Sequence, residues 1–347
     1  MKTMRVAVVG CGRIATVYSK AFAHIGSEVQ VVMAFDKVLS RAQAFAVSFP
    51  GCIPSDATTP EQVAELLKEN GVELVHILLP HHLHCAYTVA ALDAGINVLT
   101  EKPIATTAED AELMMAARDR SGCQLGVIFQ NRFIDGVQKV HQLIHDGELG
   151  KLQGAYSNLN WFRPASYYQC DWKGCWATEG GGVVIDQAIH SIDLVRYMTG
   201  LNAVKIMGHT SRRVLTTIEV EDEADAAIIL EDGSIYSFFA CNYYASNSPI
   251  RIELTYEKAV ILLTRETIEI TWKDGRGTEI IKPDPSLNPS GEDYWGCFHE
   301  VQLRETYRAF REKRQIPWTA EDAKKTLDIV LGIYESARVN ALVTLDL

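Results

Sequence analysis

Short apolar runs alternate with segments of helical periodicity through the first part of the chain. The runs are rich in β-branched residues, as expected of strands buried on both faces of a sheet. They lie at 6–9, 29–35, 72–79, 96–100 and 124–129. Helix starts such as Thr59-Pro60 and helix stops such as Gly95 separate them. This alternation predicts an α/β fold that begins with a doubly wound parallel sheet.

The pattern changes after residue 150, where strand-like runs follow one another with little helix between them. These runs lie at 152–161, 203–211, 223–230, 234–242, 250–255, 259–264 and 267–273. Asp232-Gly233 and Asp274-Gly275 are typical of hairpin turns. Helices are expected at 186–198, 295–313 and 319–337, and a loop at 283–291. We therefore expect two domains, 1–130 and 131–347, the second an α/β domain with a large, mostly antiparallel open sheet.

A glycine-rich turn follows the first apolar run. Gly10-Cys11-Gly12-Arg13-Ile14-Ala15 fits the G-x-G-x-x-A form of the dinucleotide fingerprint. Gly10 permits the tight turn, Gly12 allows a pyrophosphate to approach the backbone, and the helix start offers free N–H groups. Asp36 ends the next apolar run, close to the spacing of about 20 residues at which an acid binds the ribose. The sequence therefore predicts an NAD-binding Rossmann domain.

Composition excludes several classes of function. Of the 347 residues, 47% are hydrophobic and 22% charged, which is ordinary for a globular protein. The net charge of −11 argues against nucleic-acid or anionic-membrane binding, because no basic surplus exists to neutralise phosphates. No apolar stretch reaches membrane-spanning length and no signal-peptide pattern opens the chain. We expect a soluble, cytoplasmic protein.

Neither cysteine nor histidine spacing predicts a metal site. The eight cysteines form no C-x-x-C pair. His81, His82 and His84 resemble a metal tract, but they follow a predicted strand and precede a helix, which suits a loop at the cofactor edge better. We expect no bound metal.

Two further motifs carry candidate chemistry. Glu101-Lys102-Pro103 ends a predicted strand, where side chains of a doubly wound sheet face the ligand, and a lysine there supplies positive charge to a reacting oxygen. Alternatively, these residues form a solvated loop with a structural proline. Asp186 and His190 follow three glycines and are four residues apart, so on a helix they share a face.

A histidine at this position is suited to proton transfer. The His190 imidazole can remove a hydroxyl proton as hydride leaves the same carbon, and the Asp186 carboxylate can orient that imidazole. Asp193, one helical turn further on, is either a second partner of the imidazole or a residue that holds the helix in place. A buried histidine with a capping aspartate is the alternative interpretation.

Aromatic residues gather around Arg163 in the second half of the chain. Flat rings beside polar donors suit the apolar faces and hydroxyls of a sugar or cyclitol, and Arg163, Tyr168 and Trp172 are the expected substrate contacts. Core packing and a subunit interface are equally consistent with this composition. The aromatic members are Tyr156, Trp161, Phe162, Tyr167, Tyr168, Trp172 and Trp176.

Together these segments resemble the Gfo/Idh/MocA oxidoreductases, the glucose–fructose oxidoreductase and inositol dehydrogenase family. The resemblance covers essentially the whole chain through VVGCGRIA, LLPHHLH, TEKPIA, QNRF, GGGVVIDQAIHSIDLVRYMTG and IYESA. It implies a Rossmann domain followed by a substrate-binding domain whose open sheet forms homodimers or homotetramers. It also implies reversible oxidation of a sugar or polyol carbinol by a nicotinamide cofactor.

The resemblance also implies site residues. The catalytic residues would be Lys102, Asp186 and His190, all three of which would also contact the substrate. Glu101 would contact the nicotinamide ribose and Asn131 the nicotinamide side. The full set expected to bind the cofactor is Gly10, Gly12, Arg13, Ile14, Asp36, Arg41, Leu79, Pro80, His81, His84, Glu101, Lys102 and Asn131.

Two positions depart from the family pattern. Leu79-Pro80-His81 stands where many relatives have Thr-Pro-Asn. Asp36 should repel a 2′-phosphate and favour NAD, whereas Lys37 and Arg41 leave room for NADP.

The leading hypothesis is an NAD-dependent dehydrogenase of a sugar, sugar derivative or inositol. One alternative is the family's NAD-dependent glycosidase branch, which differs by showing no net turnover of NAD. The other is a non-catalytic nucleotide-sensing regulator, against which the retention of all three catalytic residues speaks.

Overall fold

The computed structural model describes residues 3–284 and 298–345 and forms two compact units. The first unit comprises Met1–Gln130 and Pro285–Lys324, and the second comprises Asn131–Asp284 and Lys325–Leu347. The sequence-based division at residue 130 assigned everything after it to the second domain. In the structure, a late segment of the chain packs with the first unit instead.

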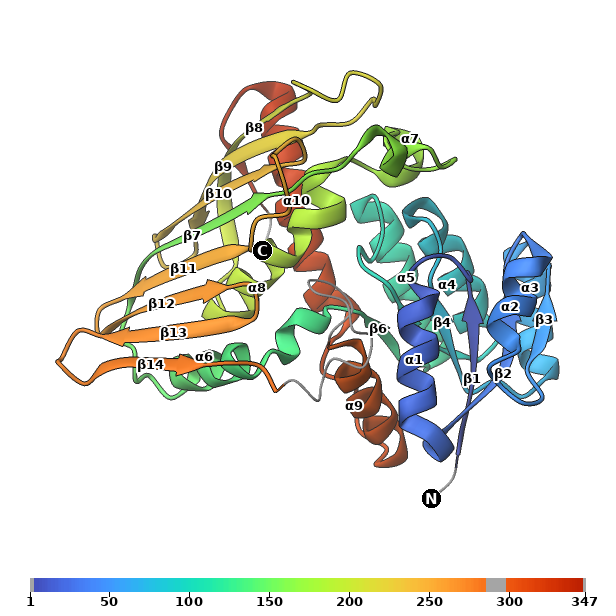
Figure 1. Ribbon diagram of the computed structural model, residues 1–347. Coiled ribbons are helices and arrows are strands. Elements are labelled where there is room, and N and C mark those ends of the chain that lie inside the picture. The colour runs from blue at the N-terminus through green and yellow to red at the C-terminus, as the bar shows by residue number, and fades with distance from the viewer. Residues whose placement is uncertain (1–2, 285–297, 346–347) are drawn as a thin grey trace. The chain divides into compact units, whose positions relative to one another are not determined.

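A six-stranded parallel sheet forms the centre of the first unit (Figure 1). Its order, β3-β2-β1-β4-β5-β6, is that of the Rossmann fold, and the order reverses at β1 and β4, where such sheets bind their ligands. The strands are β1 (Met4–Val9), β2 (Val29–Phe35), β3 (Ile53–Ser55), β4 (Leu74–Ile77), β5 (Asn97–Thr100) and β6 (Leu125–Val127). The helices are α1 (Ala15–Ile25), η1 (Gly26–Glu28), α2 (Leu39–Ala46), α3 (Pro60–Glu69), η2 (His81–Leu83), α4 (His84–Asp93), α5 (Ala108–Ser121) and α9 (His299–Arg311).

Local sequence signals explain where several of these helices begin. The Thr59 hydroxyl accepts a hydrogen bond from the Gln62 amide at 3.3 Å, so Thr59 caps α3 as predicted. The Thr107 hydroxyl caps α5 in the same way, through the Asp110 amide at 3.1 Å. These helix starts are set by residues close together in the chain.

Helix α9 belongs to the first unit through buried contacts. The Tyr307 hydroxyl oxygen and Nε2 of His76, on β4, are hydrogen-bonded at 2.8 Å, and both side chains are fully buried. Burial lowers the pKa of His76 to about 3, so its imidazole is neutral. A helical pattern reveals that a helix has an apolar face but not which sheet covers that face, and for this reason the sequence placed α9 in the other domain.

The second unit is built on a nine-stranded sheet in the order β14-β13-β12-β11-β7-β10-β9-β8-β15. Every neighbouring pair is antiparallel except β7 and β10, which confirms the expected mostly antiparallel sheet. The strands are β7 (Leu152–Asn160), β8 (Ala203–Ser211), β9 (Glu223–Leu230), β10 (Ile235–Cys241), β11 (Arg251–Tyr256), β12 (Ala259–Thr264), β13 (Thr267–Trp272), β14 (Gly277–Ile281) and β15 (Val343–Thr344).

Helices cover one face of this sheet, with α8 against β7 and β11 and α6 against β13 (Figure 1). The opposite face carries the alternate set of side chains, among them the exposed Tyr156 and the half-exposed Phe239 and Leu262. The helical segments of this part of the chain are η3 (Gln130–Phe133), α6 (Asp135–His145), η4 (Ala165–Tyr168), α7 (Trp176–Glu179), η5 (Val184–Ala188), α8 (Ile189–Thr199) and α10 (Ala320–Val339).

Some expectations concern residues that the structure leaves out. Most of the predicted loop at 283–291 and the start of the predicted helix at 295–313 lie outside the described residues. Across 3–284 and 298–345, no helix is both long and apolar enough to cross a membrane.

Candidate active site

The glycine-rich turn between β1 and α1 has the conformation that a dinucleotide requires. Gly10 has a φ of 102°, and a Cβ there would lie 2.4 Å from the Leu78 carbonyl oxygen, so only glycine fits. A Cβ at Gly12 would meet no atom within 4 Å, so the backbone is open to a ligand. Since α1 begins at Ala15, its first N–H groups point toward this loop, and the turn fits a pyrophosphate.

Asp36 joins the glycine-rich turn to the end of β2. Its carboxylate accepts hydrogen bonds from the Cys11 amide at 3.0 Å and the Val38 amide at 2.8 Å. The side chain is 7% exposed, and Arg41 Nη1 lies 3.9 Å from Oδ1. This places a fixed negative charge beside the fingerprint, where a ribose would be bound and a 2′-phosphate repelled.

The loops after β4 and β5 are tied together by a buried histidine. Nε2 of His84 lies 2.8 Å from the Leu79 carbonyl oxygen, and Nδ1 lies 2.8 Å from that of Pro103. Burial lowers the pKa of His84 despite these bonds, and a neutral ring carries a single N–H, so it donates to one of the two carbonyl oxygens at a time. His84 therefore shapes the loop that carries Leu79, Pro80 and His81, all of which follow the end of β4.

Glu101 follows β5 and anchors a second buried network. Its Oε1 accepts a hydrogen bond from the Tyr18 hydroxyl at 2.9 Å and lies 3.1 Å from Nε2 of His299 on α9. Burial would raise the pKa of Glu101, but His299, Lys102 and Tyr18 outweigh it and hold the pKa below its usual value. Glu101 is thus an oriented carboxylate, and Lys102 comes directly after it.

In the second unit, two of the three glycines pack closely against Tyr334 and Glu221. A Cβ at Gly181 would lie 2.1 Å from the Tyr334 hydroxyl, and one at Gly182 would lie 2.0 Å from the Glu221 carbonyl oxygen. The Glu221 carboxylate accepts hydrogen bonds from the Gly182 amide at 2.8 Å, the Val184 amide at 3.0 Å and the Tyr334 hydroxyl at 2.9 Å. These contacts fix the backbone that leads into the Asp186 turn.

Asp186 and His190 do not lie in one continuous α-helix as the sequence predicted. Val184–Ala188 forms a π-helical turn, and α8 starts at Ile189, so Asp186 lies in the π turn and His190 in the first turn of α8. Single π turns in helices occur often at functional sites.

Three donors converge on one oxygen of Asp186. Oδ2 accepts hydrogen bonds from the Tyr167 hydroxyl at 2.7 Å, from the Lys173 ammonium and from the Gln187 amide. The Lys173 ammonium also contacts Glu179 Oε1 at 3.1 Å. The side chains of Lys173, Asp186 and Glu179 are 12%, 8% and 1% exposed, so this is a buried charge cluster.

The sequence left two roles open for Asp193, and its contacts in the structure favour the one that holds the helix in place. Its carboxylate pairs with the Arg132 guanidinium, with Nε at 2.8 Å, and accepts a hydrogen bond from Thr326 at 3.0 Å. These contacts hold α8 in place. Asn131, expected near the nicotinamide, lies beside Arg132 in η3.

Arg163 packs against two aromatic rings near the buried charge cluster. Its guanidinium is centred 4.6 Å from the Trp161 ring and 5.1 Å from the Tyr167 ring, and its Nη1 donates to Asn247 at 3.0 Å. The residue is 7% exposed, and its guanidinium packs against the Tyr167 ring.

The other two expected substrate contacts flank the charge cluster. The Tyr168 hydroxyl accepts a hydrogen bond from Asn242 at 3.0 Å, and the Trp172 ring lies 4.3 Å from the Lys173 ammonium. Trp176 and Tyr156 lie elsewhere, Trp176 packed on Tyr334 and Tyr156 on β7.

The sequence interpretation named Trp172 and Asp186 but missed Lys173 and Glu179. One sequence signal could have identified Lys173: it is an isolated lysine between Trp172 and Gly174, inside the aromatic segment. Pairing of that lysine with Asp186 depends on how the loop folds back, and spacing does not reveal it.

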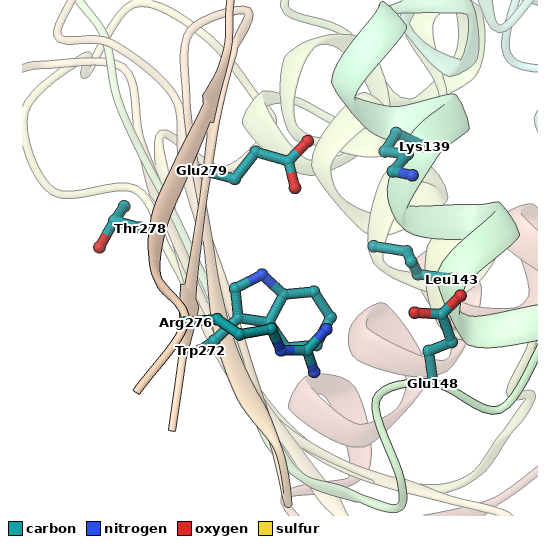
Figure 2. A pocket seen from close by; sticks show the side chains of 7 residues that line it. All are labelled: Lys139, Leu143, Glu148, Trp272, Arg276, Thr278 and Glu279. Atoms are coloured by element: carbon teal, nitrogen blue, oxygen red, sulfur yellow. The ribbon is translucent and has the colours of Figure 1, made fainter. Parts of the chain in front are cut away.

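A separate cavity of about 410 Å³ lies between α6 and the β13–β14 hairpin (Figure 2). None of the expected site residues lines it. Its lining is Lys139, Leu143, Glu148, Trp272, Arg276, Thr278 and Glu279, with the Arg276 guanidinium centred 3.6 Å from the Trp272 ring. Across the described ranges, no group of three or more His, Cys, Asp or Glu side chains is arranged to hold a metal ion.

Both units match models of known protein families. Residues 4–129 match the oxidoreductase family with an NAD-binding Rossmann fold, and residues 137–262 match the Gfo/Idh/MocA C-terminal domain. The chain therefore belongs to the Gfo/Idh/MocA family of NAD-binding oxidoreductases.

Named relatives agree with this membership. A 1-carboxy-3-chloro-3,4-dihydroxycyclohexa-1,5-diene dehydrogenase of Comamonas testosteroni is 30% identical over 60% of this chain, and the match spans 51% of that relative. The scyllo-inositol 2-dehydrogenase (NADP(+)) IolW of Bacillus subtilis is 25% identical over 99% of this chain and 96% of its own length. The WlbA dehydrogenase of Bordetella pertussis, solved with NADH and UDP-GlcNAcA, has a TM-score of 0.85 and 25% identity, and the match covers 100% of both chains.

Proposed function

We propose that this oxidoreductase transfers hydride between NAD and a secondary hydroxyl or ketone of a sugar, sugar derivative or inositol. The observation that carries the proposal is the buried, triply hydrogen-bonded Asp186, four residues before His190, in a chain with an NAD-binding domain. The relatives support the substrate class, because their names describe oxidation of carbons that bear hydroxyl groups.

The residues of the first unit would hold the cofactor. Gly10 and Gly12 would accept the pyrophosphate, Asp36 would bind the adenosine ribose, and the oriented Glu101 carboxylate would bind the nicotinamide ribose. When bound, the nicotinamide supplies the hydride acceptor. The negative charge of Asp36 favours NAD, and Arg41, whose side chain is 56% exposed, adds little attraction for a 2′-phosphate.

The remaining residues would act on the substrate. In the proposed mechanism His190 takes the hydroxyl proton, Lys102 stabilises the negative charge that develops on the oxygen, and Asp186 orients the substrate or the imidazole. Removal of the proton and stabilisation of the oxyanion both make the carbinol a better hydride donor. Tyr168 and Trp172 would border the sugar, while Arg163 would support Tyr167.

The test is reduction of NAD or NADP, followed by absorbance, with inositols, free hexoses, anhydrosugars and nucleotide-linked sugars. We expect turnover with one class, and His190→Ala and Lys102→Ala should each lower kcat by about a hundredfold or more while NAD binding stays near normal. Near-full activity in both variants, or silence across the panel despite cofactor binding, would contradict the proposal. Cleavage of a glycoside without net NAD reduction would identify the glycosidase activity instead.

We also propose that the uncovered face of the nine-stranded sheet forms a homodimer or homotetramer. Half-exposed apolar side chains on that face, Phe239 on β10 and Val260 and Leu262 on β12, support an apolar contact. Light scattering of wild type and of Leu262→Lys should show a larger assembly that the substitution dissociates. A wild-type monomer would refute this assignment.

A further inference from the structure

Lys173, which lies outside the segments that carry the family resemblance, is buried beside Asp186. Lys173 lies on the segment between η4 and α7, and its ammonium contacts both Asp186 and Glu179. The ammonium also lies 4.7 Å from the Tyr167 ring and 4.3 Å from the Trp172 ring, so two aromatic faces enclose it. A buried cation held so closely has one orientation and little freedom to leave.

We propose that Lys173 is a positioning residue of the active site, which keeps the Asp186 carboxylate ionised and oriented for the substrate hydroxyl and His190. This inference rests on the proposed function. The geometry carries it: Tyr167 and Lys173 converge on the same oxygen, Oδ2, and so fix the plane of the carboxylate. Without the Lys173 ammonium between them, the Asp186 and Glu179 carboxylates would repel each other in a buried site.

The charge balance of the cluster supports the same role. Burial and the Asp186 charge raise the pKa of Glu179 to about 8, although Lys173 and the Gly174 amide act in the opposite direction. Burial alone would lower the pKa of Lys173, but Asp186, Tyr167 and Glu179 raise it above its ordinary value. Both shifts favour the protonated forms of Glu179 and Lys173, so the cation beside Asp186 is the Lys173 ammonium. The Tyr168 hydroxyl interacts electrostatically with both carboxyls and the Tyr334 hydroxyl with that of Glu179.

Substitution of Lys173 separates this role from simple packing. In Lys173→Met the acid limb of the kcat/KM profile should move to higher pH, because Asp186 loses its cation and takes up a proton more readily. We expect kcat/KM for the polyol to fall about 10- to 100-fold, the usual effect of removing the partner that orients a reactive group, with KM for NAD changed less than about twofold. Lys173→Arg retains the charge and should recover most of the activity and the wild-type acid limb.

Lys273→Met is the matched control. The Lys273 ammonium donates to Gln153 at 3.0 Å and to the Tyr256 carbonyl oxygen, and it touches none of the expected site residues. This variant should keep the wild-type pH profile. If Lys173→Met does not fold, Lys173→Met/Glu179→Gln removes the second carboxylate along with the cation and should show the same shift.

Two results would overturn the inference. One is an unchanged acid limb with kcat/KM within about twofold of wild type in the methionine variants. The other is equal loss in Lys173→Arg and Lys173→Met with no shift in pH, which describes a structural residue. Titration of the Asp186 carboxyl by 13C NMR, in wild type and Lys173→Met, gives a readout without turnover. The titration therefore tests the role of Lys173 even if the proposed function is wrong. A wild type that reduces no nicotinamide would refute the proposed function alone.

Discussion

The Glu221→Gln substitution tests how the glycine backbone before Asp186 is held. Glu221 is 3% exposed and accepts two amide hydrogen bonds and one hydroxyl hydrogen bond. Burial raises the pKa of this carboxyl to about 7, while the Val184 amide, the Tyr334 hydroxyl and the Gly182 amide act against that rise. Burial therefore outweighs three donors, and this balance has a measurable consequence for stability.

The sign of the effect follows from proton linkage. The folded state binds more protons than the unfolded state between the ordinary pKa of 4.5 and the folded pKa of about 7. The stabilisation is therefore fully present below pH 4.5 and is lost as pH rises through about 7. At about 1.4 kcal/mol per pKa unit, the wild type should lose about 2 to 3 kcal/mol relative to the neutral glutamine variant between about pH 5 and about pH 8.

The measurement is urea unfolding of both proteins at several pH values, followed by tryptophan fluorescence. We expect the difference in free energy of unfolding to shift in favour of Glu221→Gln as pH rises, with equal denaturant slopes in the two proteins. The Glu179 titration is common to both proteins and cancels in the difference. Hydrogen exchange of the Gly182 and Val184 amides reports whether the local backbone follows the same trend.

A difference that moves the other way would refute the reasoning. It would mean that the three donors dominate over burial and hold the carboxylate ionised throughout this range, as several hydrogen bonds to a carboxylate can do. If the difference in free energy of unfolding did not change with pH, burial and the hydrogen bonds would cancel in their effects on the Glu221 pKa. That result would also contradict a folded pKa near 7.

Three further predictions concern the proposed cofactor-binding residues of the first unit and the glycine backbone of the second. Asp36→Ala should narrow the ratio of kcat/KM for NAD over NADP by about tenfold, and an unchanged ratio would remove Asp36 from the ribose. His299→Gln should weaken NADH binding, measured by fluorescence titration, by about tenfold, because the imidazole that orients the buried Glu101 carboxylate is lost; unchanged affinity would contradict that role. Gly182→Ala should lower the unfolding free energy by about 1 to 3 kcal/mol and reduce kcat, since the new Cβ meets the Glu221 carbonyl oxygen; a variant as stable and active as wild type would be incompatible with this packing.

The sequence by itself determined the elements whose causes lie close together in the chain. Gly10, Gly12 and Asp36 lie within one strand–turn–helix–strand segment, and they predicted a Rossmann domain. The six-stranded sheet of the first unit has the Rossmann strand order. Thr59 and Thr107 cap helices through amides three residues on. Such features need only local backbone geometry and a hydrophobic period, both of which a sequence displays directly.

Tertiary structure alone decided which distant side chains meet. Lys173 reaches Asp186 across 13 residues, Glu221 reaches Gly182 across 39, and His299 reaches Glu101 across 198. It also wound the residues around Asp186 into a π turn and turned Arg163 into a buried support for aromatic rings. The physical reason is that long-range pairing is set by packing and by the cost of burying a charge without a partner, neither of which has a period along the chain.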